Sequence, residues 1–187
     1  PNLSPDIGNL KNKKVIAVGR YTYQKGFDLL IEAWRIVIEK HADWTLNIYG
    51  SGETKAFQEQ IIRLGIEKNC KLNGPTSNIN EKYEESSILA FSSRFEGFGM
   101  VLLEAMSCGL PCVSFACPCG PKDIITDGKN GYLVEPENVE ALAERICHLI
   151  EHEELRKEMG KAARKRAEDF QEDKIMQKWV DLFKNVK

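Results

Sequence analysis

Short runs of apolar residues alternate along most of the chain with longer segments of helical periodicity. The apolar runs predict buried strands at 15–19, 44–50, 70–74, 88–92, 112–115 and 131–134. Apolar side chains three or four residues apart predict helices between the strands, at 26–40, 55–64, 80–85, 99–107 and, as a short turn, 121–126. Three more helices follow without an intervening strand, at 139–150, 153–168 and 172–185.

This alternation of strands and helices predicts the fold class. Parallel strands joined by helical crossovers form a sheet that is covered on both faces. Because such crossovers are right-handed, we expect a Rossmann-like, doubly wound α/β sheet of about six strands with extra C-terminal helices. Ligands bind to such sheets where the strands end, so candidate residues lie at 19–20, 50–52, 74–75, 92–97 and 117–120.

The two ends of the chain differ in character from this core. Residues 1–12 are polar, contain Pro, Gly and Asn, and show no periodicity, which is typical of a linker. We therefore expect an interdomain linker remnant at 1–12, the Rossmann-like ligand-binding domain at 13–170 and, at 171–187, a C-terminal helix that would pack on a missing N-terminal domain. The chain looks like a domain cut from something longer.

Composition and charge exclude several classes of function. The chain has 187 residues, of which 42% are hydrophobic, enough for one domain with a sizeable core. A formal net charge of -2 gives no basic excess that would support nucleic-acid binding. No apolar run is long enough to cross a membrane, and the first residues lack the features of a signal peptide. With six cysteines and no secretion signal, reduced thiols and a cytosolic location are expected.

The run from Glu96 to Glu104, with the sequence EGFGMVLLE, carries the most informative chemistry. A carboxylate within an apolar helix is costly to bury without a polar partner, so Glu104 is a candidate ligand-binding residue. The vicinal hydroxyls of a ribose could both donate to it, whereas the alternative is an ion pair or a snorkelling side chain. Gly97 and Gly99 let the backbone approach a ligand, and the helix start that follows favours phosphate.

Two basic residues lie close to the end of the first strand. Arg20 follows this strand and Lys25 precedes the next helix. A diphosphate at the strand ends would need converging cations, for which Arg supplies a bidentate fork and Lys a compact charge. The alternative is a pair of surface charges without a ligand. The sequence contains neither the dinucleotide fingerprint G-x-G-x-x-G after the first strand nor a Walker A motif.

The order of these motifs resembles a known family. The chain carries, in sequence, Gly-Arg…Lys-Gly, Gly-Ser-Gly, Ser-x-x-Glu-Gly-Phe-Gly-x4-Glu-Ala-Met-x-x-Gly-x-Pro and Gly-Pro-x-x-Ile-Ile-x-Asp-Gly-x-Asn-Gly-x-Leu-Val. This pattern is similar to the C-terminal domain of GT-B glycosyltransferases of family 4 (glycosyl transferases group 1), which are retaining enzymes. The likeness runs from about Lys14 to Phe183 and implies one half of a GT-B fold.

The resemblance implies a role for each matching position. Arg20, Lys25 and Glu96 would form the catalytic set, with the two cations on the donor diphosphate and Glu96 on hydroxyls of the transferred sugar. Glu104 would bind the ribose. Backbone amides around Phe98 would touch the sugar or phosphate, and 75–79 would line the base pocket. The further donor-binding positions are Gly19, Gly50, Gly52, Pro75, Ile79, Gly97, Phe98, Gly99, Met100 and Val101.

The implied enzyme would move a hexose from a nucleoside-diphosphate sugar to a saccharide or lipid-linked acceptor, as in cell-surface polysaccharide or lipopolysaccharide synthesis. UDP-sugar is the first expectation for the donor and GDP-sugar the next. No Asp-x-Asp motif is present, so protein cations would replace a metal, and no cofactor is expected. The acceptor site and transfer activity would need a missing N-terminal domain, and the full-length protein could associate with the inner face of the membrane.

Several alternatives stay open from the sequence. A nucleotide-sugar epimerase or a non-catalytic nucleotide-binding module could share the architecture. The family often has glutamate where this chain has Asp123. The C-x3-C-x4-C-x-C spacing of 108–119 lacks the paired C-x2-C of structural zinc sites, so free thiols are expected. The H-x-x-E-H pattern at 148–152 is interpreted as a surface helix, and the three tryptophans as packing residues.

Overall fold

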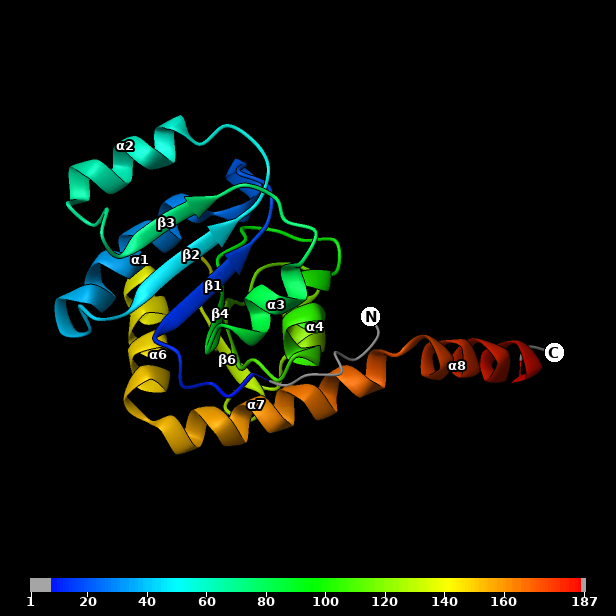
Figure 1. Cartoon of the computed structure of the whole chain (residues 1–187). Helices are drawn as coiled ribbons and strands as arrows, with labels where there is room; N and C mark the ends of the chain where they lie inside the picture. The colour runs from blue at the N-terminus through cyan, green and yellow to red at the C-terminus, as the bar shows by residue number, and fades with distance from the viewer. Residues whose placement is uncertain (1–7, 186–187) are drawn as a thin grey trace.

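A six-stranded parallel sheet forms the centre of the computed structural model, which describes residues 8–185 (Figure 1). The strands are β1 (Lys14–Val18), β2 (Thr45–Tyr49), β3 (Cys70–Asn73), β4 (Ile88–Phe91), β5 (Cys112–Phe115) and β6 (Gly131–Val134). Their order across the sheet is β3-β2-β1-β4-β5-β6, with the change of direction between β1 and β4. This is the doubly wound order, so the predicted fold class is confirmed.

Helices cover both faces of this sheet. The α-helices are α1 (Phe27–Lys40), α2 (Lys55–Leu64), α3 (Ile79–Glu84), α4 (Met100–Ser107), α5 (Pro121–Ile124), α6 (Val139–Glu151), α7 (Glu153–Ala167) and α8 (Glu172–Asn185). Two short 3-10 helices, η1 (Tyr23–Lys25) and η2 (Glu168–Phe170), complete the described elements. The sequence predicts each α-helix to within a few residues, because each has a clear apolar periodicity or lies between two strands; it does not predict η1.

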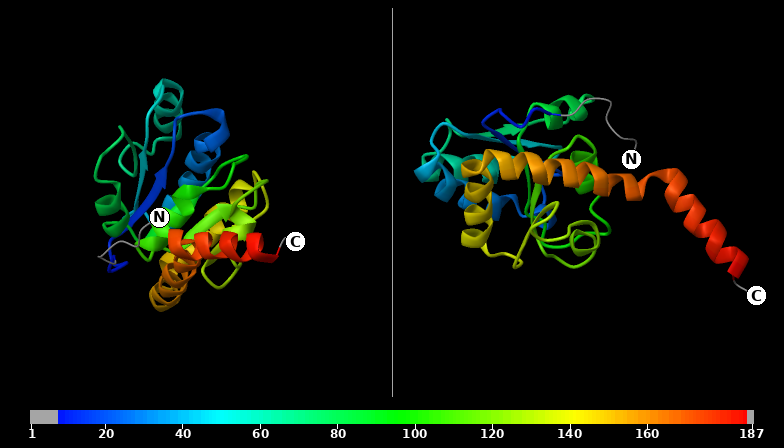
Figure 2. Two further views of the ribbon diagram at one scale, coloured as in Figure 1. Left: turned by 90° about the vertical axis from the view of Figure 1, so that its right-hand side faces the viewer. Right: turned by 90° about the horizontal axis from the view of Figure 1, so that it is seen from below.

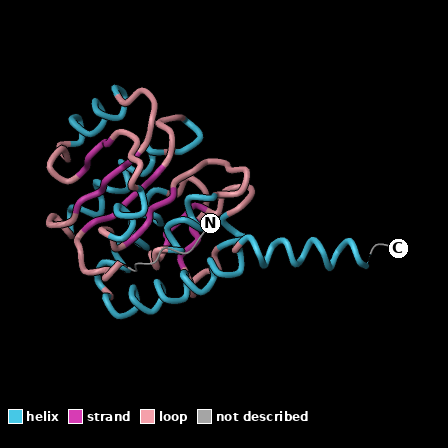
Figure 3. The backbone as a smooth tube through the Cα atoms, turned by 45° about the vertical axis from the view of Figure 1, so that its right-hand side comes forward, coloured by secondary structure: helices cyan, strands magenta, loops and turns pink. Residues whose placement is uncertain are grey.

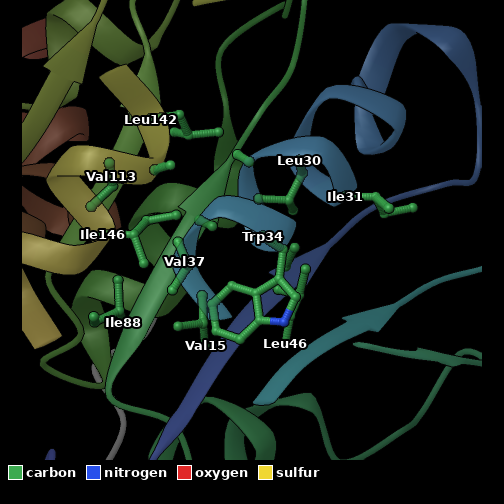
Figure 4. Close-up of a cluster of buried hydrophobic side chains, with 14 of the residues drawn as sticks. Val15, Leu30, Ile31, Trp34, Val37, Leu46, Ile88, Val113, Leu142 and Ile146 are labelled. Carbon is green, nitrogen blue, oxygen red and sulfur yellow. The ribbon is translucent and has the colours of Figure 1, made fainter. Parts of the chain in front are cut away.

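The buried core consists of two layers, one on each face of the sheet, and side chains of β1 contribute to both in alternation. Val15 and Ala17 belong to one buried cluster and Ile16 to the other, since successive side chains of a strand point to opposite faces. The first layer, shown in Figure 4, packs Trp34 of α1 and Ile146 of α6 against the sheet. The indole N–H of Trp34 donates to the carbonyl of Asn69 over 2.8 Å, which satisfies the only polar atom of this fully buried side chain.

The second layer also holds part of the segment before β1. Residues 8–12 form no helix or strand, but Leu10 is buried in this layer beside residues of α4 and α7. The buried guanidinium of Arg156 donates to the Leu10 carbonyl at 3.1 and 2.9 Å. This part of the expected linker is therefore anchored to the domain, while the expectation for residues 1–7 lies outside the described residues.

Helix α8 extends away from the body of the domain (Figures 2 and 3). Its large apolar side chains are exposed, including Trp179 at 52% and Phe183 at 69%. Trp34 and Trp44 are packing residues as predicted, whereas none of the described elements covers the face of α8 that carries Trp179. No helix within residues 8–185 is both long and apolar enough to span a bilayer.

Candidate functional site

A pocket of about 300 Å³ lies at the carboxyl ends of β1, β2 and β3. The arrowheads of these strands point to the same edge of the sheet in Figure 1. Arg20 contributes to the pocket from the β1 end, and Glu104 from α4. The full lining is Val18, Gly19, Arg20, Tyr49, Gly50, Ser51, Pro75, Thr76, Ile79 and Glu104. Six predicted site residues thus converge, although they come from four separate segments of the chain.

Close approach of the strand ends depends on glycine. A Cβ atom on Gly50 would lie 1.7 Å from the carbonyl oxygen of Gly19, so no side chain fits there. A Cβ atom on Gly19 would lie 3.0 Å from the side chain of Lys25. The stem of Lys25 therefore crosses the end of β1 beside the pocket, even though Lys25 does not line the pocket itself.

Glu104 is half-buried and meets a neutral hydrogen-bond donor. The hydroxyl of Tyr83 on α3 lies 3.2 Å from Oε2 of Glu104. Burial of Tyr83, and secondly the charge of Glu104, raise the pKa of this hydroxyl well above its ordinary value, so that it stays a donor. Within residues 8–185 Glu104 makes no ion pair, which rules out that alternative explanation of its position in an apolar helix.

Lys25 and Glu96 pair directly with each other. Their Nζ and Oε1 atoms are 2.7 Å apart, and the side chains are only 14% and 8% exposed. The Lys25 ammonium also lies 5.7 Å from the centre of the Phe91 ring. Two nearly buried charges compensate each other in this way, because either one alone would be costly to bury. The sequence predicts both residues in the site but not this contact.

Arg94 is a central residue that the sequence interpretation missed. Its guanidinium binds both carboxylate oxygens of Asp28 at 2.9 and 2.7 Å and contacts Glu137 at 3.1 Å. It also donates to the Tyr23 carbonyl at 2.8 Å and stacks on the Tyr23 ring at 4.0 Å. Burial tends to raise the pKa of Asp28, but the hydrogen bonds and charge of Arg94 outweigh burial and lower it.

The segments that carry Lys25 and Glu96 are joined through their backbones. The hydroxyl of Ser92 donates to the Lys25 carbonyl at 2.9 Å, and the amide of Arg94 donates to the Gln24 carbonyl at 2.8 Å. The side-chain amide of Gln24 in turn donates to the Phe95 carbonyl at 3.0 Å. Element η1 and the loop after β4 therefore hold Lys25 and Glu96 in a fixed relation.

The Gly-Phe-Gly turn leads into α4 as predicted. Gly99 is the residue before the helix and has a φ of 89°, a left-handed conformation that favours glycine. Phe98 is 41% exposed and packs edge-on against Phe170, with the ring centres 5.9 Å apart. The amide of Leu102 donates to the Gly99 carbonyl at 2.9 Å, whereas the amides of Met100 and Val101, at the very start of α4, have no helical carbonyl one turn earlier. Gly97, Met100 and Val101 belong to the same turn and first helical residues.

Gly52 is among the predicted site residues that do not line the main pocket. It lines a neighbouring pocket of about 400 Å³ with Tyr21, Asn73 and other residues. The hydroxyl of Tyr21 lies 2.9 Å from the carbonyls of Ile48 and Asn73, and burial raises its pKa to about 12. The φ of 124° at Gly52 shows that this glycine shapes the turn after β2. The turn carries Gly52 past the strand ends, and its donor contact stays a prediction.

The model of a known family, described as Glycosyl transferases group 1, matches residues 4–166. The chain belongs to the glycosyl transferases group 1. Among its relatives is the amylovoran biosynthesis glycosyltransferase AmsD of Erwinia amylovora, 37% identical over 182 residues. The match covers 97% of this chain and 51% of that protein. The chain therefore spans about half the length of this curated relative.

Solved structures of glycosyltransferases share this architecture. One is a mutant of S. aureus TarM, which was solved in complex with fondaparinux, alpha-GlcNAc-glycerol and UDP. It matches with a TM-score of 0.89 and 32% identity, and the match covers 98% of this chain and 37% of that chain. Anabaena HepE in complex with UDP-glucose has a TM-score of 0.84 and 28% identity, over 94% of this chain and 50% of that chain. The chain is thus built like one half of a GT-B glycosyltransferase.

Other candidate motifs of this group 1 domain are accounted for by packing or surface contacts. Burial raises the pKa of the Cys112 thiol, and all six cysteines are free. His148 and His152 stack at the end of α6 with ring centres 4.3 Å apart, and Glu151 between them instead contacts His41 at 3.0 Å. Asp123 lies in α5, where its backbone carbonyl accepts a hydrogen bond from Arg166. Residues 8–185 contain no group of three acidic, His or Cys side chains arranged to hold a metal ion.

Proposed function

We propose that the pocket binds the nucleoside diphosphate of a sugar donor and that the chain is the donor-binding domain of a retaining hexosyltransferase. The observation that carries this proposal is the convergence of Arg20 and Glu104 on one pocket at the carboxyl edge of the sheet. A cation for diphosphate and a carboxylate for ribose face the same space. The pocket draws on elements from both sides of the change in strand direction, where ligands of doubly wound sheets bind.

The proposed chemistry assigns a separate task to each charge. Breaking the sugar–phosphate bond gives an oxocarbenium-like sugar and a departing diphosphate. Arg20, Lys25 and the start of α4 would stabilise the negative charge that grows on the diphosphate. Glu96 would accept hydrogen bonds from hydroxyls of the transferred sugar. The ion pair with Lys25 holds Glu96 in place beside the end of β1 before a donor arrives.

UDP-sugar is our proposal for the donor, with GDP-sugar as the next candidate. UDP in the TarM complex and UDP-glucose in the HepE complex support a uridine nucleotide. The proposed acceptor is a saccharide or lipid-linked saccharide in cell-surface polysaccharide or lipopolysaccharide synthesis, supported by the role of AmsD in amylovoran biosynthesis.

We assign the acceptor site to an N-terminal half beyond this chain. Half of the length of AmsD lies outside the match, and the exposed apolar face of α8 offers a surface on which such a half would pack. We expect the helix at 171–187 to reach this half. Residues 186–187 of that range lie outside the described residues. The 187 residues alone should bind nucleotide but transfer no sugar, and a normal transfer rate from them would contradict this division.

The proposal includes a cytoplasmic location. The full-length protein would attach peripherally to the inner face of the membrane. The support for the cytoplasmic location is that all six cysteines are free thiols, as in proteins of a reducing compartment. Fractionation of cells that express the full-length protein would test this, and secretion of the protein would contradict it.

Calorimetric titration with UDP and GDP tests the assignment of the two carboxylates. Glu104→Ala should weaken binding of the free nucleotide by about tenfold or more, because it removes the acceptor for the ribose hydroxyls. Glu96→Ala should leave the affinity for free nucleotide nearly unchanged, since Glu96 is assigned to hydroxyls of the transferred sugar, which the free nucleotide lacks. Equal losses in both variants would contradict the assignment, and no binding of either nucleotide would overturn the proposed function.

A further inference from the structure

Tyr83 is a polar residue beside the pocket to which the proposed function gives no task. It lies on α3, one helical turn after Ile79, and is completely buried at 0% exposure. Its hydroxyl contacts Oε2 of Glu104 at 3.2 Å. A large buried aromatic with a polar tip needs a hydrogen-bond partner for that tip. For Tyr83 that partner is the carboxylate that lines the pocket.

This contact restricts the direction of the Glu104 carboxylate. Turning the carboxylate away would leave the buried hydroxyl of Tyr83 without an acceptor, which is costly. No other side chain within residues 8–185 hydrogen-bonds to this carboxylate, so Oε1 is available for a ligand. A carboxylate oxygen has two lone pairs, so Oε2 can accept a further hydrogen bond while it holds the Tyr83 hydroxyl.

We propose that Tyr83 is a positioning residue that sets the selectivity of the pocket for ribose over deoxyribose. The inference rests on the proposed function, because it requires that Glu104 accepts hydrogen bonds from the 2′ and 3′ hydroxyls. A carboxylate that is already oriented loses less side-chain freedom when a ligand binds. Tyr83 itself touches no ligand: it acts only through Glu104.

The test compares the affinities of a nucleoside diphosphate and its 2′,3′-dideoxy form by calorimetry. UDP and its dideoxy form are the first pair, and GDP and its dideoxy form replace them if GDP binds more tightly. Tyr83→Phe keeps the ring and removes the hydroxyl, so the packing of α3 is retained. The preference for ribose should fall by about three- to tenfold, while the affinity for the dideoxy nucleotide stays the same.

Two further variants separate positioning from a structural effect. Tyr132→Phe removes a hydroxyl from another buried tyrosine, on β6, and should leave the ribose preference unchanged. In a Glu104→Ala background Tyr83→Phe should add nothing, because the residue through which it acts is absent. Glu104→Gln should weaken the ribose preference while Tyr83 is present, since the hydroxyl donates to the amide oxygen and leaves toward the ligand an NH2 group that cannot accept from the ribose hydroxyls.

Each outcome distinguishes the inference from the proposed function. If the unmodified chain binds the ribose and dideoxy forms equally, the role of Glu104 is wrong. If the unmodified chain prefers ribose and folded Tyr83→Phe prefers it as strongly, only the role of Tyr83 is wrong. If Tyr83→Phe fails to fold, the Glu104→Gln variant provides the test instead. A Glu104→Gln chain that keeps the full ribose preference would then overturn the role of Tyr83. Binding of no nucleotide at all overturns both.

Discussion

Single backbone positions decide the shape of the pocket, and Gly50 is the clearest of them. The carbonyl oxygen of Gly19 lies 1.7 Å from the position that a Cβ atom of Gly50 would take. Gly74 follows the neighbouring strand β3, but a Cβ atom there would meet nothing within 4 Å. Both residues are glycines just after a strand of the same sheet, yet only the first is required by close packing.

Gly50→Ala should therefore destabilise the domain by about 2 kcal/mol or more, because the ends of β1 and β2 must move apart. The matched change Gly74→Ala should alter the free energy of unfolding by less than about 1 kcal/mol. Chemical denaturation of the two variants measures both values. Similar losses of stability in the two variants would show that the close contact between Gly19 and Gly50 does not require glycine at position 50.

Between elements, Arg94 acts as the main connection around Lys25 and Glu96. Its side chain joins the loop after β4 to η1 through the Tyr23 carbonyl and to α1 through Asp28. The Arg94 side chain is 9% exposed, whereas that of Asp28 is 43% exposed. Solvent screening at Asp28 limits the contribution of this pair to stability.

The Asp28–Arg94 pair should make stability depend on pH. The pKa of Asp28 is lower in the folded chain, so the pair stabilises the fold above the unfolded pKa of about 3.9, and this stabilisation is lost as pH falls through the folded pKa. Asp28→Asn should thus cost about 1 kcal/mol near neutral pH and progressively less below about pH 4.

Asp43→Asn is the matched control for this measurement. Asp43 pairs with Lys13, but both side chains are more than half exposed, so its loss should change stability much less. Chemical denaturation across this pH range measures both variants. A cost of Asp28→Asn that stays constant from neutral pH to well below about pH 4 would contradict the role of the ion pair.

For the whole molecule, the sequence predicts the architecture well and the contacts of the site only in part. Alternating periodicity predicts the strands and helices because each element depends on residues close together in the chain. The pairs Lys25–Glu96 and Arg94–Asp28 join residues 71 and 66 positions apart, and no local pattern encodes such distances. Likewise, the apolar periodicity of α8 predicts a helix but does not show what its apolar face packs against.

Binding of a nucleoside diphosphate at the carboxyl edge is tested most directly by an NMR titration of the isotope-labelled chain with UDP. The largest amide shift changes should occur at 19–20, 50–51, 76, 79 and 104, which line the pocket, and at 99–101, where α4 begins. A larger pocket, of about 470 Å³, lies between α7 and residues 8–10, and its amides should not respond. Shift changes concentrated at that second pocket, or none at the carboxyl edge, would contradict the proposed site.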